Sequence, residues 1–173
     1  MTIFNTERLE IKELQAIDKK DFIELTTAED ITQLIPQSKP SLEKVEAMFH
    51  EFANYELAPL EKENVVWGIY KKNQDELIGL SALLTNDNKE REIGYRFKKK
   101  YWGNGYGTEV TKQMITYCFD YLNVPKLTAD VWIENTGSVK VLEKFFFPVK
   151  EFFNKQDHCM DRRYALKKED WLK

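Results

Sequence analysis

The sequence is short of cysteine, histidine and long apolar runs. Its two cysteines, Cys118 and Cys159, have no CxxC spacing, and with only two histidines beside them no metal centre is expected. No run of about 18 apolar residues is present, so no membrane span is expected. A formal net charge of −3 disfavours a nucleic-acid binder that relies on a basic surface. The first residues show no basic stretch before an apolar one, so we expect a cytoplasmic protein without a signal peptide.

Glycine is also scarce, yet three of the seven glycines stand at alternate positions in one stretch. Gly103, Gly105 and Gly107 follow a strand pattern that ends near Phe97, and a helical pattern begins near Thr108. A loop with so little side chain exposes its backbone N–H groups, and the start of the next helix adds unpaired donors and a positive dipole end. The stretch is therefore typical of a phosphate cradle, with a plain tight turn as the alternative.

The remaining pattern indicates one domain, residues 1–173, of the α+β class (mixed α/β). Three middle strands joined by short polar turns predict an antiparallel meander. Strands are expected over residues 5–12, 65–70, 77–84, 91–97, 127–133 and 161–166, with another in the aromatic run 145–153. Helices are expected from about Asp18, Ser41, Thr108 and Asn135.

Several motifs together resemble the GNAT superfamily of N-acetyltransferases, and within it the Rim-type branch of ribosomal-protein N-terminal acetyltransferases. The superfamily's loop carries a Gly-x-Gly/Ala pattern that Gly105 and Gly107 match, whereas Trp102 replaces its usual polar first residue. The loop lacks the Gly-Lys-Ser/Thr ending of a P-loop and the glycine spacing of a dinucleotide fold. The matching segments are residues 6–9, 92–95, 101–109, 135–138 and 141–147.

The resemblance implies a central, mostly antiparallel sheet that splays between the superfamily's strands 4 and 5, with helices on both faces. The pantetheine of acetyl-CoA would enter this gap like an extra strand, and Gly94 would ease a bulge that opens it. Lys98, Lys99 and Lys100 would steer the phosphates or simply be solvated at the strand end. No metal is implied. The implied CoA-binding residues are Tyr95, Phe97, Trp102, Gly103, Asn104, Gly105, Tyr106, Gly107, Thr108, Asn135 and Ser138.

The implied reaction is direct attack of a neutral amine on the thioester, with a backbone N–H of strand 4 stabilising the oxyanion. The superfamily often places its base on strand 4, which makes Glu92 the first candidate, although an exposed strand charge is an equal interpretation. Asp157 in the last hairpin and Glu134 at the end of a strand are the alternatives.

The departing thiolate needs a proton donor. Many members use a tyrosine where this chain has Leu142, so the resemblance implies Ser138 as the substitute. Ser138 and Asn135 could equally act as helix caps. The branch usually ends this short helix with Gly-Phe, but Phe146 stands at the glycine's place and resists a left-handed conformation.

The sequence thus predicts an acetyl-CoA-dependent N-acetyltransferase that acts on a primary amine, either a protein N-terminus or a small molecule. We expect a monomer or homodimer without nucleic-acid or membrane partners. A non-catalytic acyl-CoA-binding or sensing module is the first alternative, and a pure interaction protein that binds no CoA is the second. Acidic residues of the early helices would form a wall suited to a cationic acceptor, or a solvated face: Glu24, Glu29, Asp30, Glu43, Glu46, Glu51 and Glu56.

Overall fold

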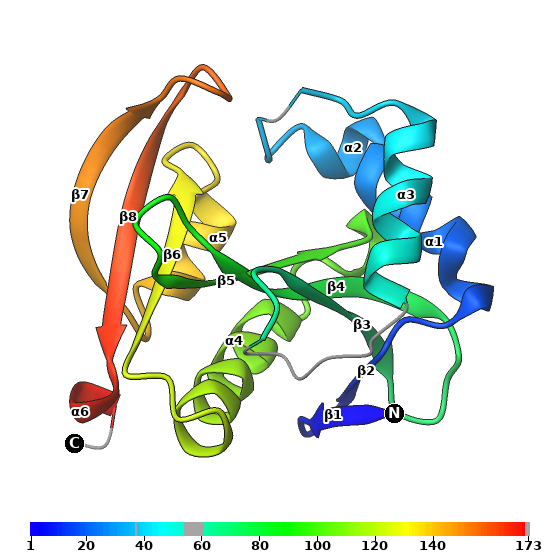
Figure 1. The fold of residues 1–173 in the computed structure, drawn as a ribbon, viewed down its shortest axis with the longest axis horizontal. Coiled ribbons are helices and arrows are strands. Elements are labelled where there is room, and N and C mark those ends of the chain that lie inside the picture. Colours follow the sequence, from blue (N-terminus) through cyan, green and yellow to red (C-terminus); the bar gives the residue numbers. More distant parts are fainter. Residues whose placement is uncertain (37, 54–60, 172–173) are drawn as a thin grey trace.

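The computed structural model describes residues 1–36, 38–53 and 61–171. Within these ranges eight strands form one sheet in the order β1-β2-β3-β4-β5-β6-β8-β7 (Figure 1). Neighbouring strands run antiparallel except β5 and β6, which are parallel. The strands are β1 (Thr2–Asn5), β2 (Leu9–Lys12), β3 (Val65–Lys71), β4 (Leu77–Thr85), β5 (Arg91–Phe97), β6 (Lys126–Trp132), β7 (Phe147–Asn154) and β8 (Cys159–Lys167).

Helices cover both faces of the sheet, which confirms the expected α+β class (Figure 1). One face carries α1 (Lys19–Thr27), α2 (Glu29–Thr32) and α3 (Leu42–Ala53), and the other carries α4 (Tyr106–Thr116). None of the helices in the described ranges is long and apolar enough to cross a membrane. The shorter elements are α5 (Thr136–Leu142), α6 (Lys168–Trp171), the 3₁₀ turns Ala16–Asp18 and Lys99–Tyr101, and a π-helical turn over Tyr117–Tyr121.

The alternation of β5 assigns its side chains to the two faces. Ile93 and Phe97 belong to the core under α4, where Tyr95 packs at the edge. Successive side chains of a strand point to opposite faces, so Gly94 and Arg96 point to the side of α1 and α3. Their partners on β4, Ala82 and Leu80, indeed belong to the core under those helices. Glu92 shares this second face by the same alternation.

The strands β5 and β6 meet at one residue pair and then separate. Glu92 is opposite Thr128, and the Thr128 hydroxyl donates a 3.1 Å hydrogen bond to the Arg91 carbonyl. Beyond this pair no ladder joins the two strands in the described residues, which confirms the expected splay. The β4–β5 register is continuous through Gly94, so the expected bulge there is wrong. The parallel partner strand diverges instead, and the gap opens without a bulge.

Local differences from the expected elements have simple causes. Residues 5–12 form two strands rather than one, because the Thr6 hydroxyl accepts from the Leu9 N–H (2.9 Å) and closes a turn. The expected Ser41 cap is confirmed by its 3.3 Å hydrogen bond from the Lys44 N–H. Phe146 is not left-handed. Its side chain, 3% exposed, fills the core under α4, so the chain leaves α5 without the glycine of the branch.

Candidate active site

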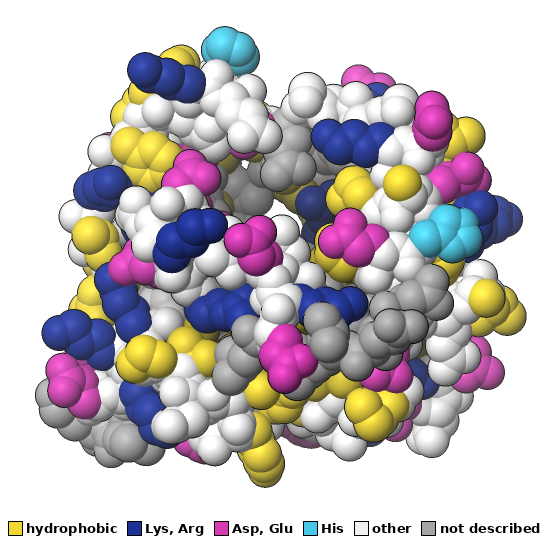
Figure 2. Space-filling view, viewed as in Figure 1, with side chains coloured by type: hydrophobic (Ala, Val, Ile, Leu, Met, Phe, Trp, Pro, Cys, Tyr) yellow, Lys and Arg dark blue, Asp and Glu magenta, His cyan; other side chains and the backbone are white. Residues whose placement is uncertain are grey.

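Two adjoining cavities lie where β5 and β6 separate. The larger has a volume of about 600 Å³ and lies between β4, β5, β6 and the α2–α3 side, while the smaller, of about 310 Å³, lies against the glycine loop. Tyr95, Arg96, Asn135 and Ser138 line both, so the cavities meet at these residues. Figure 2 shows the hollow between the β7–β8 side of the molecule and the α2–α3 side. The volumes are those of small-molecule sites.

The glycine loop has the backbone of a cradle. Gly103 (φ 75°) and Gly105 (φ 79°) are left-handed, a conformation that glycine adopts without strain. A Cβ at Gly103 would meet no atom within 4 Å, so the loop surface is open there. The Asn104 amide donates to the carbonyls of Tyr101 and Trp102, both at 3.1 Å, and braces the loop from within. The open donors at the start of α4 fit the pyrophosphate of CoA.

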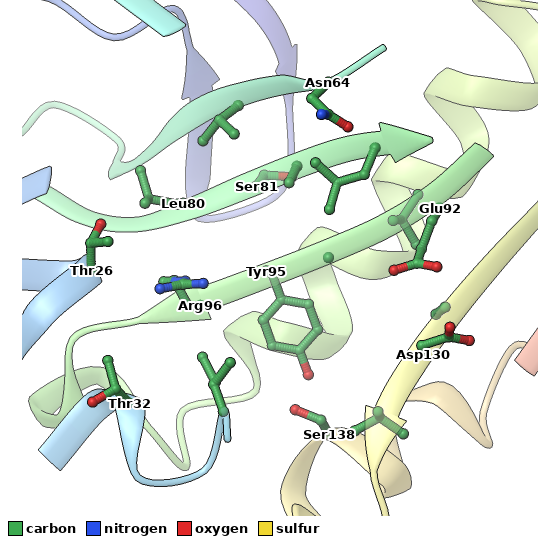
Figure 3. A pocket seen from close by; sticks show the side chains of 18 of the residues that line it. Thr26, Thr32, Asn64, Leu80, Ser81, Glu92, Tyr95, Arg96, Asp130 and Ser138 are labelled. Atoms are coloured by element: carbon green, nitrogen blue, oxygen red, sulfur yellow. The ribbon is translucent and has the colours of Figure 1, made fainter. Parts of the chain in front are cut away.

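Gly107 serves a different purpose from the other two loop glycines. A Cβ at this position would lie 3.0 Å from ring atoms of Tyr95, so the glycine lets that ring pack against α4. The ring of Tyr95 points toward Ser138 (Figure 3). Burial raises the pKa of Tyr95, and the Ser138 side chain opposes that rise. A half-buried phenol beside a serine is a candidate proton donor that the sequence patterns did not indicate.

The backbone of β5 faces the gap at its odd-numbered residues. The Arg91 carbonyl bonds to β6, and strand geometry turns the N–H and C=O groups of Tyr95 and Phe97 the same way. The Phe97 carbonyl also accepts a 2.9 Å hydrogen bond from the indole N–H of Trp102. This orientation therefore suits hydrogen bonding to an extended chain of amides. The Phe97 carbonyl has one lone pair left for such a ligand, because the other accepts from Trp102.

Glu92 is a carboxylate of the larger cavity with a strongly raised pKa. Its Oε2 atom is buried without a hydrogen-bond partner in the described structure. Burial and the neighbouring charge of Asp130 raise its pKa to about 7, while Arg163 opposes the rise (Figure 3). Asp130 itself forms a two-pronged ion pair with Arg163, at 2.8 and 2.5 Å. Ser81 Oγ and Thr111 Oγ1 are likewise buried without partners among the described residues and line the same cavity.

The other two candidate bases lie elsewhere. Asp157 accepts a 2.9 Å hydrogen bond from the Asn154 amide within the β7–β8 turn, and it lines neither cavity. Glu134 is exposed and also lines neither. Of the three carboxylates, Glu92 alone faces the space in which an acceptor would meet the thioester.

Asn135 and two of the three lysines of the strand end are engaged by the protein itself. The Asn135 side chain accepts from the Ser138 N–H (3.2 Å) and donates to the Leu34 carbonyl (3.0 Å), so it caps α5 and ties down the segment after α2. Lys98 is buried beside Asp21 at 2.8 Å, and Lys100 pairs with Glu76 at 2.7 Å, so neither is available to steer phosphates.

The acidic wall expected on the early helices is absent from the cavity in the part of the chain that the structure describes. Glu24 pairs with Lys98 (3.3 Å) and Glu46 with Lys19 (2.9 Å), and Glu56 lies outside the described residues. None of the described acidic residues of this set lines either cavity: Glu24, Glu29, Asp30, Glu43, Glu46 and Glu51. Their helical period turns them to solvent instead.

Three side chains in the cavity went unnoticed in the sequence. Arg96 lies two strand positions beyond Gly94 on the face of Glu92, so period-two alternation could have found it. Asp130 sits on β6, and no pattern in the sequence signals its proximity to Glu92. The ring of Tyr95 was expected to contribute its backbone alone.

The match to known proteins agrees with this geometry. The family model described as an acetyltransferase (GNAT) domain matches residues 8–147. The chain belongs to the GNAT acetyltransferase family. The N-acetyltransferase YoaA of Bacillus subtilis (strain 168) is 28% identical over 84% of this chain and 82% of its own length.

Solved GNAT structures share the fold over nearly the whole chain. Spermidine N-acetyltransferase of Vibrio cholerae, solved with CoA and spermine, has a TM-score of 0.78 at 18% identity, covering 95% of this chain and 98% of that one. The ribosomal L7/L12 α-N-protein acetyltransferase RimL, solved with CoA, has a TM-score of 0.78 at 15% identity, covering 98% of this chain and 99% of that one. This GNAT protein is therefore an acetyl-CoA-dependent N-acetyltransferase, and the Rim-type enzymes are one of several groups that share its fold.

Proposed function

We propose that the protein transfers the acetyl group of acetyl-CoA directly to a primary amine, with Glu92 as the base. The observation that carries this proposal is the Glu92 carboxylate, whose Oε2 atom is buried without a partner in the described structure, in a cavity that opens onto the glycine loop. Its pKa of about 7 lies close to the ordinary working pH, where a general base is most effective.

The glycine loop and the gap together would hold the acyl donor. The residues that we assign to CoA binding are Tyr95, Phe97, Trp102, Gly103, Gly105, Tyr106, Gly107, Thr108, Asn135 and Ser138, with Asn104 bracing the loop. Acetyl-CoA supplies an activated acyl group when bound. The gap-facing N–H groups of β5 are placed to stabilise charge on the acyl oxygen, and one such donor contributes on the order of 3 kcal/mol.

Proton transfer would then involve two groups on opposite faces of β5. An α-amino group has a pKa near 8 and a lysine amine near 10.4, so Glu92 removes a proton more readily from the former. Ser138, toward which the Tyr95 hydroxyl points, lies across the gap and would return a proton to the leaving sulfur. Holding both substrates in register would contribute much of the remaining rate.

A direct assay tests this proposal against its alternatives. Purified protein is incubated with acetyl-CoA and a panel of amines, and the free thiol of CoA is measured. Thiol release with at least one amine is expected. An acyl-CoA sensor would bind CoA without releasing thiol, and an interaction protein would not bind CoA. The neighbouring structures name spermidine and a ribosomal protein as acceptors, so polyamines and peptide N-termini belong in the panel.

A further inference from the structure

Arg96 is a cation without an anionic partner inside the site. Its side chain is half-buried and lines both cavities, at the end of β5 opposite Thr26 and Thr32 (Figure 3). Its guanidinium donates a hydrogen bond to the Leu25 carbonyl at 3.3 Å, and no carboxylate pairs with it in the described residues. Burial lowers the pKa of Arg96, and no acidic group offsets that effect. A buried charge is costly unless a partner compensates it.

Two further cations border the larger cavity on the same side. Lys39 lies between α2 and α3, Lys44 lies in the first turn of α3, and both side chains are exposed. Neither lysine forms an ion pair within the described part of the chain. Figure 2 shows basic side chains on the α2–α3 side of the hollow. The helical side of the site therefore presents positive charge, the opposite of the wall that its composition suggested.

The acidic groups of the cavity do not balance these cations. Asp130 is neutralised by its two-pronged pair with Arg163. Glu92 has a pKa of about 7, so near neutral pH a large fraction of it carries no charge. Glu92 and Arg96 also lie four residues apart on one face of β5, about 13 Å along the strand. Gly94 stands between them, and a Cβ there would meet no atom within 4 Å.

Resting on the proposed acetyltransferase function, we propose that the acceptor is a small amine that also carries a carboxylate or phosphate group, bound by Arg96. The amine meets the thioester near Glu92, and the anionic group lies across the open space beside Gly94 against the guanidinium. A guanidinium binds either anion through two parallel hydrogen bonds. Lys39 and Lys44 attract such an acceptor from solvent. A polyamine would instead place a second ammonium against Arg96, which is unfavourable.

Matched substrate pairs test the proposal with the thiol-release assay. γ-Aminobutyrate is compared with butylamine, O-phosphoethanolamine with ethanolamine, and spermidine is included as the polycation. We expect kcat/KM to be at least tenfold higher for the member that carries the carboxylate or phosphate than for its partner without that group, and lower for spermidine than for either anion-bearing amine. The two pairs separate carboxylate from phosphate acceptors. Equal or better turnover of butylamine, ethanolamine or spermidine would overturn the proposal.

Variants of Arg96 and Lys44 test whether these cations cause the preference for acceptors that carry an anionic group. Arg96→Gln should raise the KM of the anionic acceptor tenfold or more and abolish the preference within each pair, while the KM for acetyl-CoA changes less than twofold. Arg96→Lys keeps the charge and should restore part of the preference. Lys44→Gln should lower kcat/KM for the anionic acceptor severalfold, more so at low salt. Lys112→Gln, an exposed lysine of α4 that lines neither cavity, is the control.

The outcomes separate this inference from the function on which it rests. CoA binding without thiol release from any amine would contradict the acetyltransferase itself. Thiol release with no preference for anionic members would leave the enzyme standing and reject the anionic acceptor. A rise in the KM for acetyl-CoA in Arg96→Gln would assign the guanidinium to CoA and also reject the proposal. Should Arg96→Gln lose its fold by circular dichroism, Arg96→Lys and Lys44→Gln decide the question alone.

Discussion

We propose that the two sides of β5 serve the two substrates, and these two sides are built differently. On the side of α4, the CoA cradle comes mostly from one contiguous stretch, residues 102–108, with backbone groups as its main donors. On the side of α1 and α3, the acceptor cavity combines side chains from distant segments, among them Lys44, Glu92, Arg96 and Asp130. Backbone donors tolerate many side chains, whereas an assembled set of charges changes with each substitution. We therefore expect the cradle to be shared across the family and the acceptor side to be particular to this chain.

The largest effect is expected at Glu92, on the acceptor side. Glu92→Gln should lower kcat/KM by about 10²–10⁴, the usual contribution of a positioned base, while the affinity for CoA stays the same. Measured kcat/KM and CoA binding by calorimetry check this. If Glu92→Gln weakened CoA binding as much as it lowered kcat/KM, the two sides of β5 would not be separate substrate sites.

The same variant should become more stable than the wild type as the pH rises. The folded-state pKa of Glu92, about 7, lies above its ordinary 4.5, so the folded chain holds an extra proton between these values and loses stability as pH rises through them. Glu92→Gln lacks this loss and should gain up to about 3 kcal/mol above pH 7. Urea unfolding at pH 5 and pH 8 measures it. Glu90 is the control: Lys126 lowers its pKa below the ordinary 4.5, so the stability that Glu90 contributes is present above that pH. Glu90→Gln should therefore lose nearly the same stability at pH 5 and at pH 8.

A pair of glycines tests the cradle side. Gly107 and Gly137 are each the second residue of a helix, where alanine is favoured by up to about 0.5–1 kcal/mol. A Cβ at Gly137 lies 3.8 Å from its nearest neighbour, but one at Gly107 lies 3.0 Å from the Tyr95 ring. Gly137→Ala should therefore raise the free energy of unfolding, and Gly107→Ala should not. Gly107→Ala should also lower kcat by roughly tenfold, because the Tyr95 hydroxyl is pushed from Ser138. Equal stability gains would contradict this account.

The Tyr95–Ser138 pair should act as one proton donor. Tyr95→Phe keeps the ring beside Gly107 and removes the hydroxyl, and it should lower kcat by roughly tenfold, as should Ser138→Ala. The double variant should lose little more than either single one, because both changes break the same route to the sulfur. Single-turnover rates of the three variants give the coupling. Fully multiplicative losses would show two independent roles.

The smallest effect is a shift of the pH profile. Asp130→Asn removes a negative charge that raises the pKa of Glu92 and frees Arg163, whose charge lowers it. The acidic limb of the kcat/KM profile should therefore move below the wild-type position near pH 7. Asp161→Asn should move it less, since Asp161 contributes the weakest of the resolved effects on Glu92. An unmoved limb in Asp130→Asn would mean that another group titrates.

Much of the fold was visible in local patterns. The meander, the glycine loop and α4 were expected near their observed bounds, because period-two and helical stretches there are long and are separated by clear turn residues. The turn at Thr6 was missed because alternation continues through it. The expectation of a bulge at Gly94 was wrong, because the gap comes from the divergence of β6, a partner strand about 35 residues further along the chain.

The sequence by itself determined the donor side of this enzyme. A cradle made of contiguous backbone needs only glycine spacing and a following helix, and both are local properties. The tertiary structure alone decided the acceptor side. Whether Glu92 is a solvated charge or a base depends on burial and on Asp130 and Arg163, which folding brings beside it. Whether the early helices offer acidic or basic groups to the cavity depends on which of their faces the sheet covers. In the folded chain, Lys44 of α3 borders the cavity, together with Arg96 of β5.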